Sequence, residues 1–122
     1  FRSFQHMGYT HYWQQPQPFT DTAWSEFVRD VKMVFGTTNV DLAGGLGDRG
    51  TKPNVTKDFV RFNGVEDDSH ETCTVTRNAV DFEFCKTAHK PYDAVVVEVL
   101  KLARQHNPSI ELSSDGGPEI FD

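Results

Sequence analysis

Apolar residues recur along this sequence with two periods, that of an α-helix and that of a β-strand. In residues 21–36 they fall three and four positions apart, which predicts a helix with one buried face. Thr20 or Asp21 is suited to cap its start and Gly36 to end it. A second helix is expected from Pro91 to Asn107. The apolar positions are Trp24, Phe27, Val28, Val31, Val34 and Phe35 in the first helix, and Val95, Val96, Val99, Leu100, Leu102 and Ala103 in the second.

The other segments alternate apolar and polar residues, as half-buried strands do. Strands are expected at residues 8–13, 40–43, 59–62, 72–75, 80–84 and 110–112. The turn Asn78–Ala79 would close residues 72–77 and 80–85 into a hairpin, which makes an antiparallel meander. The glycine-rich residues 44–57 are predicted to be a long loop.

Each predicted element has one apolar side to bury, which favours a single α+β domain. We expect a mainly antiparallel sheet with both helices packed on one face. The length of 122 residues fits one domain. Residues 1–6 join no pattern and end at a His-Met pair typical of a cloning junction, so we expect a leader at 1–6, a native start at Met7 and the domain at 7–122.

The charge balance limits the partners of such a domain. The net charge is -6, from 18 acidic and 12 basic residues, and 37% of residues are hydrophobic. A broad cationic surface for duplex nucleic acid or anionic lipid is therefore excluded. The sequence contains neither an 18-residue apolar run nor a signal-peptide pattern, so we expect a cytoplasmic protein that does not enter membranes.

The two cysteines are expected to be free thiols. In the predicted hairpin Cys73 lies opposite Phe84, which puts Cys85 on the other face and out of reach for a disulfide. Free thiols agree with a reducing compartment.

A cluster of cations is the strongest candidate for a ligand site. Lys86, His89 and Lys90 come just before the second helix, whose free N–H groups add positive partial charge at the same place. This pattern predicts an anion pocket, and the alternative is an ordinary strand-to-helix connection with exposed lysines. Arg49, in the glycine-rich loop, is expected to close over the pocket, although the loop matches neither a P-loop nor a dinucleotide fingerprint.

Aromatic residues of the first strand are candidates for the same ligand. Tyr9 and His11 share one face of the strand and Tyr12 lies on the other. They are suited to stack on a base or polarise a phosphate, and the alternative is that they belong to the core or an interface. Asp115, in a predicted turn at residues 114–117, completes the candidate ligand-binding set.

Residues 66–71 gather four carboxylates and one imidazole. Their spacing matches no calcium loop and no zinc motif, so we expect a solvated acidic turn, no metal and no cofactor. His70 beside Glu71 is nevertheless a candidate acid–base pair, and His11 is a further candidate base.

Several peptides of this chain resemble a family of small phage and prophage proteins that open with the same residues. The resemblance implies an origin in a mobile element and specifies no chemistry. It would place the protein in a host cytoplasm. The matching segments are 7–13, 62–64, 70–72, 84–88, 90–93 and 113–116.

These observations lead to three hypotheses. The first is a phage accessory protein that binds a small anionic ligand, namely a nucleotide or a nucleotide-derived defence signal, as a sponge or inhibitor. The second is a small hydrolase or lyase that acts on a phosphate-bearing ligand with a histidine base, and the third is an inhibitor of a host protein. We also expect a homodimer, with the first strand at a sheet edge and Tyr12 and Trp13 between subunits. The alternative is a central first strand with its aromatic residues in the core.

Overall fold

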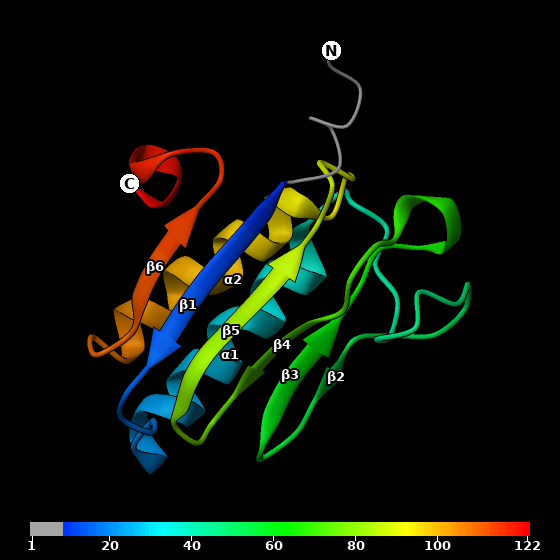
Figure 1. Cartoon of the computed structure of the whole chain (residues 1–122). Coiled ribbons are helices and arrows are strands. Elements are labelled where there is room, and N and C mark those ends of the chain that lie inside the picture. The colour runs from blue at the N-terminus through cyan, green and yellow to red at the C-terminus, as the bar shows by residue number, and fades with distance from the viewer. Residues whose placement is uncertain (1–8) are drawn as a thin grey trace.

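A computed structural model describes residues 9–122 and shows two layers, with the helices behind the strands (Figure 1). One antiparallel sheet has the strand order β5-β1-β6 and the other the order β2-β3-β4. Both helices cover the same side of the strands, so the predicted α+β architecture is confirmed. The elements are β1 (Thr10–Gln15), α1 (Asp21–Thr37), β2 (Asn54–Val55), β3 (Phe59–Phe62), β4 (Cys73–Thr76), β5 (Val80–Lys86), α2 (Asp93–His106) and β6 (Glu111–Ser114), with short 3-10 turns η2 (Glu66–Asp68) and η3 (Pro118–Phe121).

The helices begin close to the predicted positions. Thr20 caps α1, and its hydroxyl accepts a hydrogen bond from the Ala23 N–H at 3.1 Å. Gly36 does not end this helix, which continues to Thr37. The turn that contains Pro91 precedes α2, which starts at Asp93. Neither helix has the length and apolar composition needed to cross a membrane.

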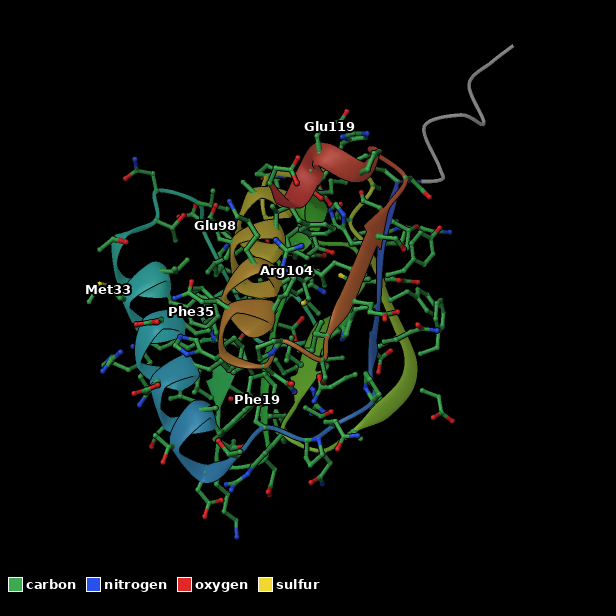
Figure 2. All side chains as sticks on the ribbon, turned by 90° about the vertical axis from the view of Figure 1, so that its left-hand side faces the viewer. Phe19, Met33, Phe35, Glu98, Arg104 and Glu119 are labelled. Carbon is green, nitrogen blue, oxygen red and sulfur yellow. The ribbon has the colours of Figure 1, made fainter. Side chains whose placement is uncertain are left out.

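The core lies between the helices and the two sheets. Helix α1 contributes Trp24, Phe27 and Val31, and α2 contributes Val95, Val96, Val99, Leu100 and Ala103. The side chains of Trp13, Val60, Phe62 and Val75 meet them from the strands. Figure 2 shows the helical layer edge-on against the strands. This packing holds the first turn of α2 against one end of the sheet β5-β1-β6.

The predicted hairpin and the continuous meander are wrong. Strand β5 pairs with β1, and β4 pairs with β3, so β4 and β5 belong to different sheets. Asn78–Ala79 lacks the glycine that tight hairpin turns prefer, and β5 finds its ladder partner in a distant segment. The prediction that the cysteines point to opposite faces is also wrong, because Cys73 and Cys85 are both buried in the one core and their thiols interact.

Strand β1 is central, so its predicted position at a sheet edge is wrong. Trp13 is 2% exposed and belongs to the core, as the alternative interpretation held. The predicted strand at residues 40–43 reduces to a single bridge between Ala43 and Asn63, and the predicted loop 44–57 contains β2. The predicted leader at 1–6, the start at Met7 and the first position of the predicted strand lie outside the described residues.

Candidate functional site

A buried histidine marks the candidate site at the end of the sheet where α2 begins. His11 lies on β1 with its ring turned toward the helices, and its side chain is 0% exposed. The strand register places Cys85 of β5 on one side of His11 and Ser114 of β6 on the other. Burial of an imidazole is unfavourable unless both ring nitrogens have partners, and here both do.

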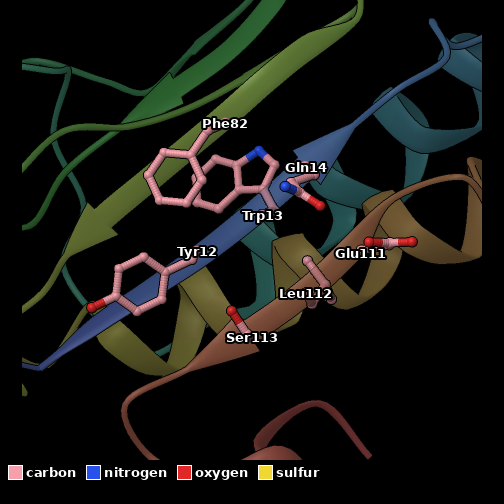
Figure 3. Close-up of a pocket in the computed structure, with 7 residues that line it drawn as sticks. All are labelled: Tyr12, Trp13, Gln14, Phe82, Glu111, Leu112 and Ser113. Atoms are coloured by element: carbon pink, nitrogen blue, oxygen red, sulfur yellow. The ribbon is translucent and has the colours of Figure 1, made fainter.

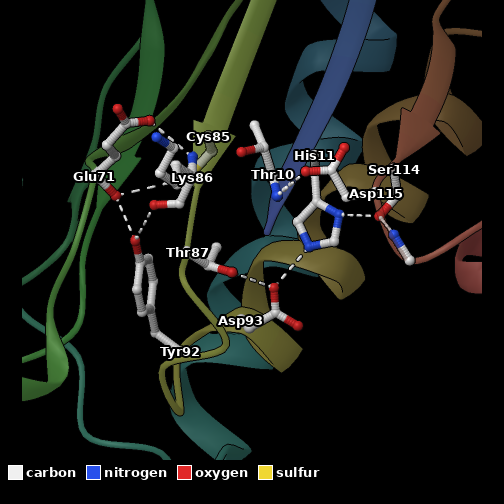
Figure 4. Close-up of polar contacts among 11 residues, drawn as sticks. Thr10, His11, Glu71, Cys85, Lys86, Thr87, Tyr92, Asp93, Ser114 and Asp115 are labelled. Carbon is white, nitrogen blue, oxygen red and sulfur yellow. Dashed lines mark hydrogen bonds and ion pairs between the residues drawn. The ribbon is translucent and has the colours of Figure 1, made fainter. Parts of the chain in front are cut away.

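Ser114, His11 and Asp93 form a continuous chain of hydrogen bonds (Figure 4). His11 Nδ1 lies 2.9 Å from Ser114 Oγ, and His11 Nε2 lies 2.6 Å from Asp93 Oδ1. An ionised carboxylate can only accept, so Nε2 carries a proton. In the neutral ring, Nδ1 then accepts the hydroxyl proton of Ser114, whose oxygen accepts the Gly116 N–H at 3.0 Å.

Asp93, the first residue of α2, keeps its negative charge in this setting. Burial by itself raises the pKa of its carboxyl, but hydrogen bonds from His11 and Thr87 outweigh burial, and the net pKa is lowered. The Thr87 hydroxyl donates to the same oxygen, Oδ1, at 2.5 Å. A carboxylate in the first helical turn is also stabilised by the helix dipole. Asp93 is thus an ionised acceptor that fixes the orientation of the His11 ring.

Aromatic side chains surround the imidazole. The Tyr9 ring meets His11 edge-on with centroids 5.2 Å apart, and Phe121 does the same at 5.6 Å. His89 stacks on the outer side of Tyr9 at 3.5 Å. Burial, followed by the charge of Asp93, raises the pKa of the Tyr9 hydroxyl, which therefore stays a proton donor. A Cβ atom on Gly116 would lie 2.5 Å from that hydroxyl and 2.7 Å from the Ile120 side chain, so a larger residue in this turn would displace both side chains.

The loop between β5 and α2 has an unusual backbone at the site. Ala88 and His89 have φ angles of 53° and 59°, in the left-handed region that residues with a Cβ disfavour. The N–H groups of Thr87 and Ala88 both donate to the Tyr9 carbonyl, which holds the loop in place. Consecutive strained residues beside a buried polar network are typical of functional sites.

This arrangement has the parts of an activated nucleophile. A hydroxyl lies within hydrogen-bond reach of a base, and a third group orients the base. Ser114 is half-buried, whereas the His11 side chain is fully buried. Within residues 9–122, no three His, Cys, Asp or Glu side chains gather as they would around a metal ion.

The predicted ligand-binding residues divide between the two faces of the sheet. Tyr9 packs on His11 and His89 stacks on Tyr9, whereas Tyr12 and Lys86 point to the face away from His11. Asp115 is engaged within the fold, because Oδ2 accepts the Thr10 N–H and Oδ1 accepts the Tyr12 hydroxyl, each at 3.0 Å. Lys90 is half-buried in the strained loop, where its N–H donates to the Thr87 carbonyl.

Three predicted residues have other surroundings. Arg49 forms an exposed ion pair with Glu66 at 3.0 Å. Glu71 accepts the Lys86 N–H at 2.7 Å and joins the two sheets, while the His70 side chain is exposed. The Glu71 carboxylate therefore accepts a backbone hydrogen bond where the two sheets meet.

The sequence interpretation missed the partners of His11, namely Ser114, Asp93 and Thr87. Asp93 follows a Pro-Tyr pair at a helix start, and Ser114 opens a Ser-Asp-Gly turn, so each carried only a structural signal. Comparisons with protein-family models, with curated proteins and with solved structures found no match.

Proposed function

We propose that this protein is a small hydrolase in which Ser114 is the nucleophile and His11 the general base. The chain of hydrogen bonds from Ser114 through His11 to Asp93 carries the proposal. The Ser114–His11 link, at 2.9 Å, has the ordinary length of a hydrogen bond, and the His11–Asp93 link, at 2.6 Å, is short as expected for a bond to a carboxylate. Asp93 acts as a positioning residue, since it touches the base and not the reacting atoms.

The reaction follows from this geometry. His11 Nδ1 takes the Ser114 hydroxyl proton as the oxygen attacks the electrophilic atom of an ester. The imidazolium that forms is stabilised by the Asp93 carboxylate, and it returns the proton to the departing alcohol. Water then hydrolyses the Ser114 ester with the same base, which regenerates the serine. The Tyr9 hydroxyl, packed over Gly116 beside this serine, is the available donor to the developing oxyanion.

Basic side chains of the neighbouring loop support an anionic substrate. His89 and Lys90 lie in this loop, and His89 stacks directly on Tyr9. Side chains of this type attract phosphate or carboxylate groups in a protein whose overall charge is negative. We therefore place the substrate among small anionic esters, which include phosphate-bearing ones.

A fluorophosphonate, which phosphonylates activated serines, tests the nucleophile. The expected result is one adduct by intact mass, mapped by peptide sequencing to Ser114 and lost in Ser114→Ala. Because general-base catalysis contributes roughly 10²–10⁴-fold, His11→Gln should slow labelling by at least about 100-fold. Asp93→Asn should slow it less, since the base remains.

Ser113→Ala is the matched control, because Ser113 is the adjacent residue and lies on the opposite face of β6. It should label at the rate of the unmodified protein. The proposal fails if the folded protein forms no adduct, or if the adduct persists in Ser114→Ala.

Binding without turnover is a second candidate function, favoured by the complete burial of His11. In this case His89 and Lys90 hold the phosphate of a nucleotide beside the Tyr9 ring. A ligand at 100 times its Kd would stabilise the fold by about 2.7 kcal/mol, which raises the melting temperature by several degrees. Thermal denaturation with linear and cyclic nucleotides should show this shift, and Lys90→Ala should abolish it while the exposed control Lys57→Ala retains it. An unchanged melting temperature with every nucleotide would contradict this function.

A further inference from the structure

The outer face of the sheet β5-β1-β6 carries aromatic side chains on the side away from the helices. Tyr12, Phe82 and Phe84 form this aromatic face, with Phe82 56% and Phe84 45% exposed. Ring centroids are 6.0 Å apart for Tyr12 and Phe82 and 6.1 Å apart for Phe82 and Phe84. Large exposed aromatic residues that lie side by side are uncommon on a soluble domain and mark interaction sites.

The strand register explains why these side chains gather. Tyr12 pairs directly with Phe84 of β5 and with Ser113 of β6, so all three point to the same face. Phe82 lies two positions before Phe84 on β5, so the alternation of side chains along the strand points it to the same face. The aromatic face is therefore built by pairing between strands far apart in sequence.

A shallow depression of about 290 Å³ lies on this face (Figure 3). Tyr12, Phe82, Gln14 and Glu111 line it, and a second depression of about 280 Å³ shares the last two and adds Asp81. Each volume is slightly below the ~300–1,000 Å³ of pockets that hold a whole small-molecule ligand. The size is suited to the head group of a single side chain.

The charges around the aromatic face are mainly negative. Asp81 and Glu111 are exposed along the depressions, and Asp115 lies beyond Tyr12. Lys86 is the cation on this face of β5, at the end that pairs with Thr10. Carboxylates beside aromatic rings attract a cation and repel a phosphate.

The same charges disfavour a second copy of this chain. In a two-fold dimer through this face, the carboxylates of one subunit would meet those of the other, at an energetic cost. A cationic partner has no such penalty. The chain itself shows this pairing elsewhere, because the Arg61 guanidinium carbon lies 4.1 Å above the Phe59 ring on β3.

We propose that the aromatic face, with Asp81 and Glu111, is a docking surface for an arginine-containing basic segment of a partner protein. Guanidinium groups stack on Phe and Tyr rings while they pair with carboxylates, and arginine does both better than lysine. The segment binds on the outer face, whereas Ser114 and His11 face the helices. The proposal therefore does not depend on the proposed hydrolase.

Fluorescence anisotropy with a labelled hexa-arginine peptide tests this surface, with hexa-lysine and hexa-glutamate peptides as comparisons. We expect the protein to bind hexa-arginine more tightly than hexa-lysine and not to bind hexa-glutamate. Loss of one exposed cation–π contact weakens binding about 2- to 5-fold, which sets the effect expected for Phe82→Ala and for Phe84→Ala. Glu111→Gln should also weaken binding.

Two control variants remove similar groups from the helical layer. Met33→Ala removes an exposed apolar side chain of α1, and Glu98→Gln removes an exposed carboxylate of α2 (Figure 2). Circular dichroism should show all variants folded, since none of the substituted side chains is buried in the core. The proposal is supported if only the outer-face variants weaken hexa-arginine binding.

Three results would overturn it. The first is that hexa-arginine does not bind. The second is that Glu98→Gln weakens binding as much as Glu111→Gln, which would show a general attraction of the peptide to an acidic protein. The third is light scattering that detects a dimer abolished by Phe82→Ala, which would assign the face to a second copy of the chain.

Discussion

Replacement of Asp93 by asparagine should destabilise the fold by about 1–2 kcal/mol at neutral pH. Asp93 Oδ1 accepts two hydrogen bonds, from His11 at 2.6 Å and from Thr87 at 2.5 Å. A hydrogen bond to a charged group contributes ~1.5–3 kcal/mol and a neutral one ~0.5–1.5 kcal/mol. Asparagine keeps an acceptor of the same shape, so each bond loses about 1 kcal/mol. The Asp93 side chain is 21% exposed, and solvent screening therefore places the expected destabilisation below the sum of the two losses.

The cost should depend on pH, because the pKa of Asp93 is lowered in the folded state. A carboxyl whose folded pKa lies below its unfolded value of about 3.9 stabilises the fold fully above that value. This contribution disappears as the pH falls through the folded pKa, when the carboxyl becomes protonated in both states. The difference between Asp93→Asn and the unmodified protein should therefore shrink as the pH is lowered from 4 toward 2.

Urea denaturation followed by tryptophan fluorescence measures both effects. Trp13 and Trp24 are 2% and 4% exposed, so unfolding transfers them to water and shifts their emission. With a slope of ~1–2 kcal/mol per molar urea, the midpoint at pH 7 should fall by about 1 M. Asp41→Asn, in an exposed loop, is the control and should leave the midpoint unchanged. If Asp93→Asn changes the free energy of unfolding by less than about 0.5 kcal/mol, or by the same amount at every pH, then Asp93 is not the ionised acceptor described above.

Other predictions concern the core, a helix cap and the thiols. Phe27→Ala should cost about 3–5 kcal/mol in urea denaturation, because Phe27 is fully buried and packs on other aromatic rings; a cost under 1 kcal/mol would contradict the observed packing. Thr20→Ala should lower the free energy of unfolding by about 0.5–2 kcal/mol through loss of the cap on α1, whereas Thr20→Ser keeps a capping hydroxyl and should retain most of that stability. A hydrogen bond with Cys85, followed by burial, raises the pKa of the Cys73 thiol. Native protein should therefore react with a chromogenic disulfide only as fast as it unfolds. An immediate reaction would show that the thiols are accessible.

Local sequence patterns were sufficient to place the helices and most strands. The spacing of Trp24, Phe27 and Val31 identifies the buried face of α1, and Thr20 identifies its first turn. These signals involve residues within a few positions of each other, so they can be read without the tertiary structure. The 3-10 turns η2 and η3 carry no such periodicity and were not predicted.

Strand pairing and the site depend on contacts between distant segments. His11 is 82 residues from Asp93 and 103 residues from Ser114, and only the pairing of β1 with β6 and the packing of α2 bring them together. The sequence marked His11 as a candidate base because of its residue type, but it contained no signal for the partners. The expected edge position of β1 failed for the same reason, since both neighbours of β1 come from the second half of the chain.

The hydrogen-bond chain through His11 is the central claim, and long-range ¹H–¹⁵N NMR of histidine-labelled protein at pH 7 tests it most directly. His11→Gln assigns the resonances of this ring. We expect a proton on Nε2, which donates to Asp93, and an unprotonated Nδ1 whose resonance moves in Ser114→Ala but not in Ser113→Ala. A ring with the proton on Nδ1, or a ring insensitive to Ser114→Ala, would contradict the account.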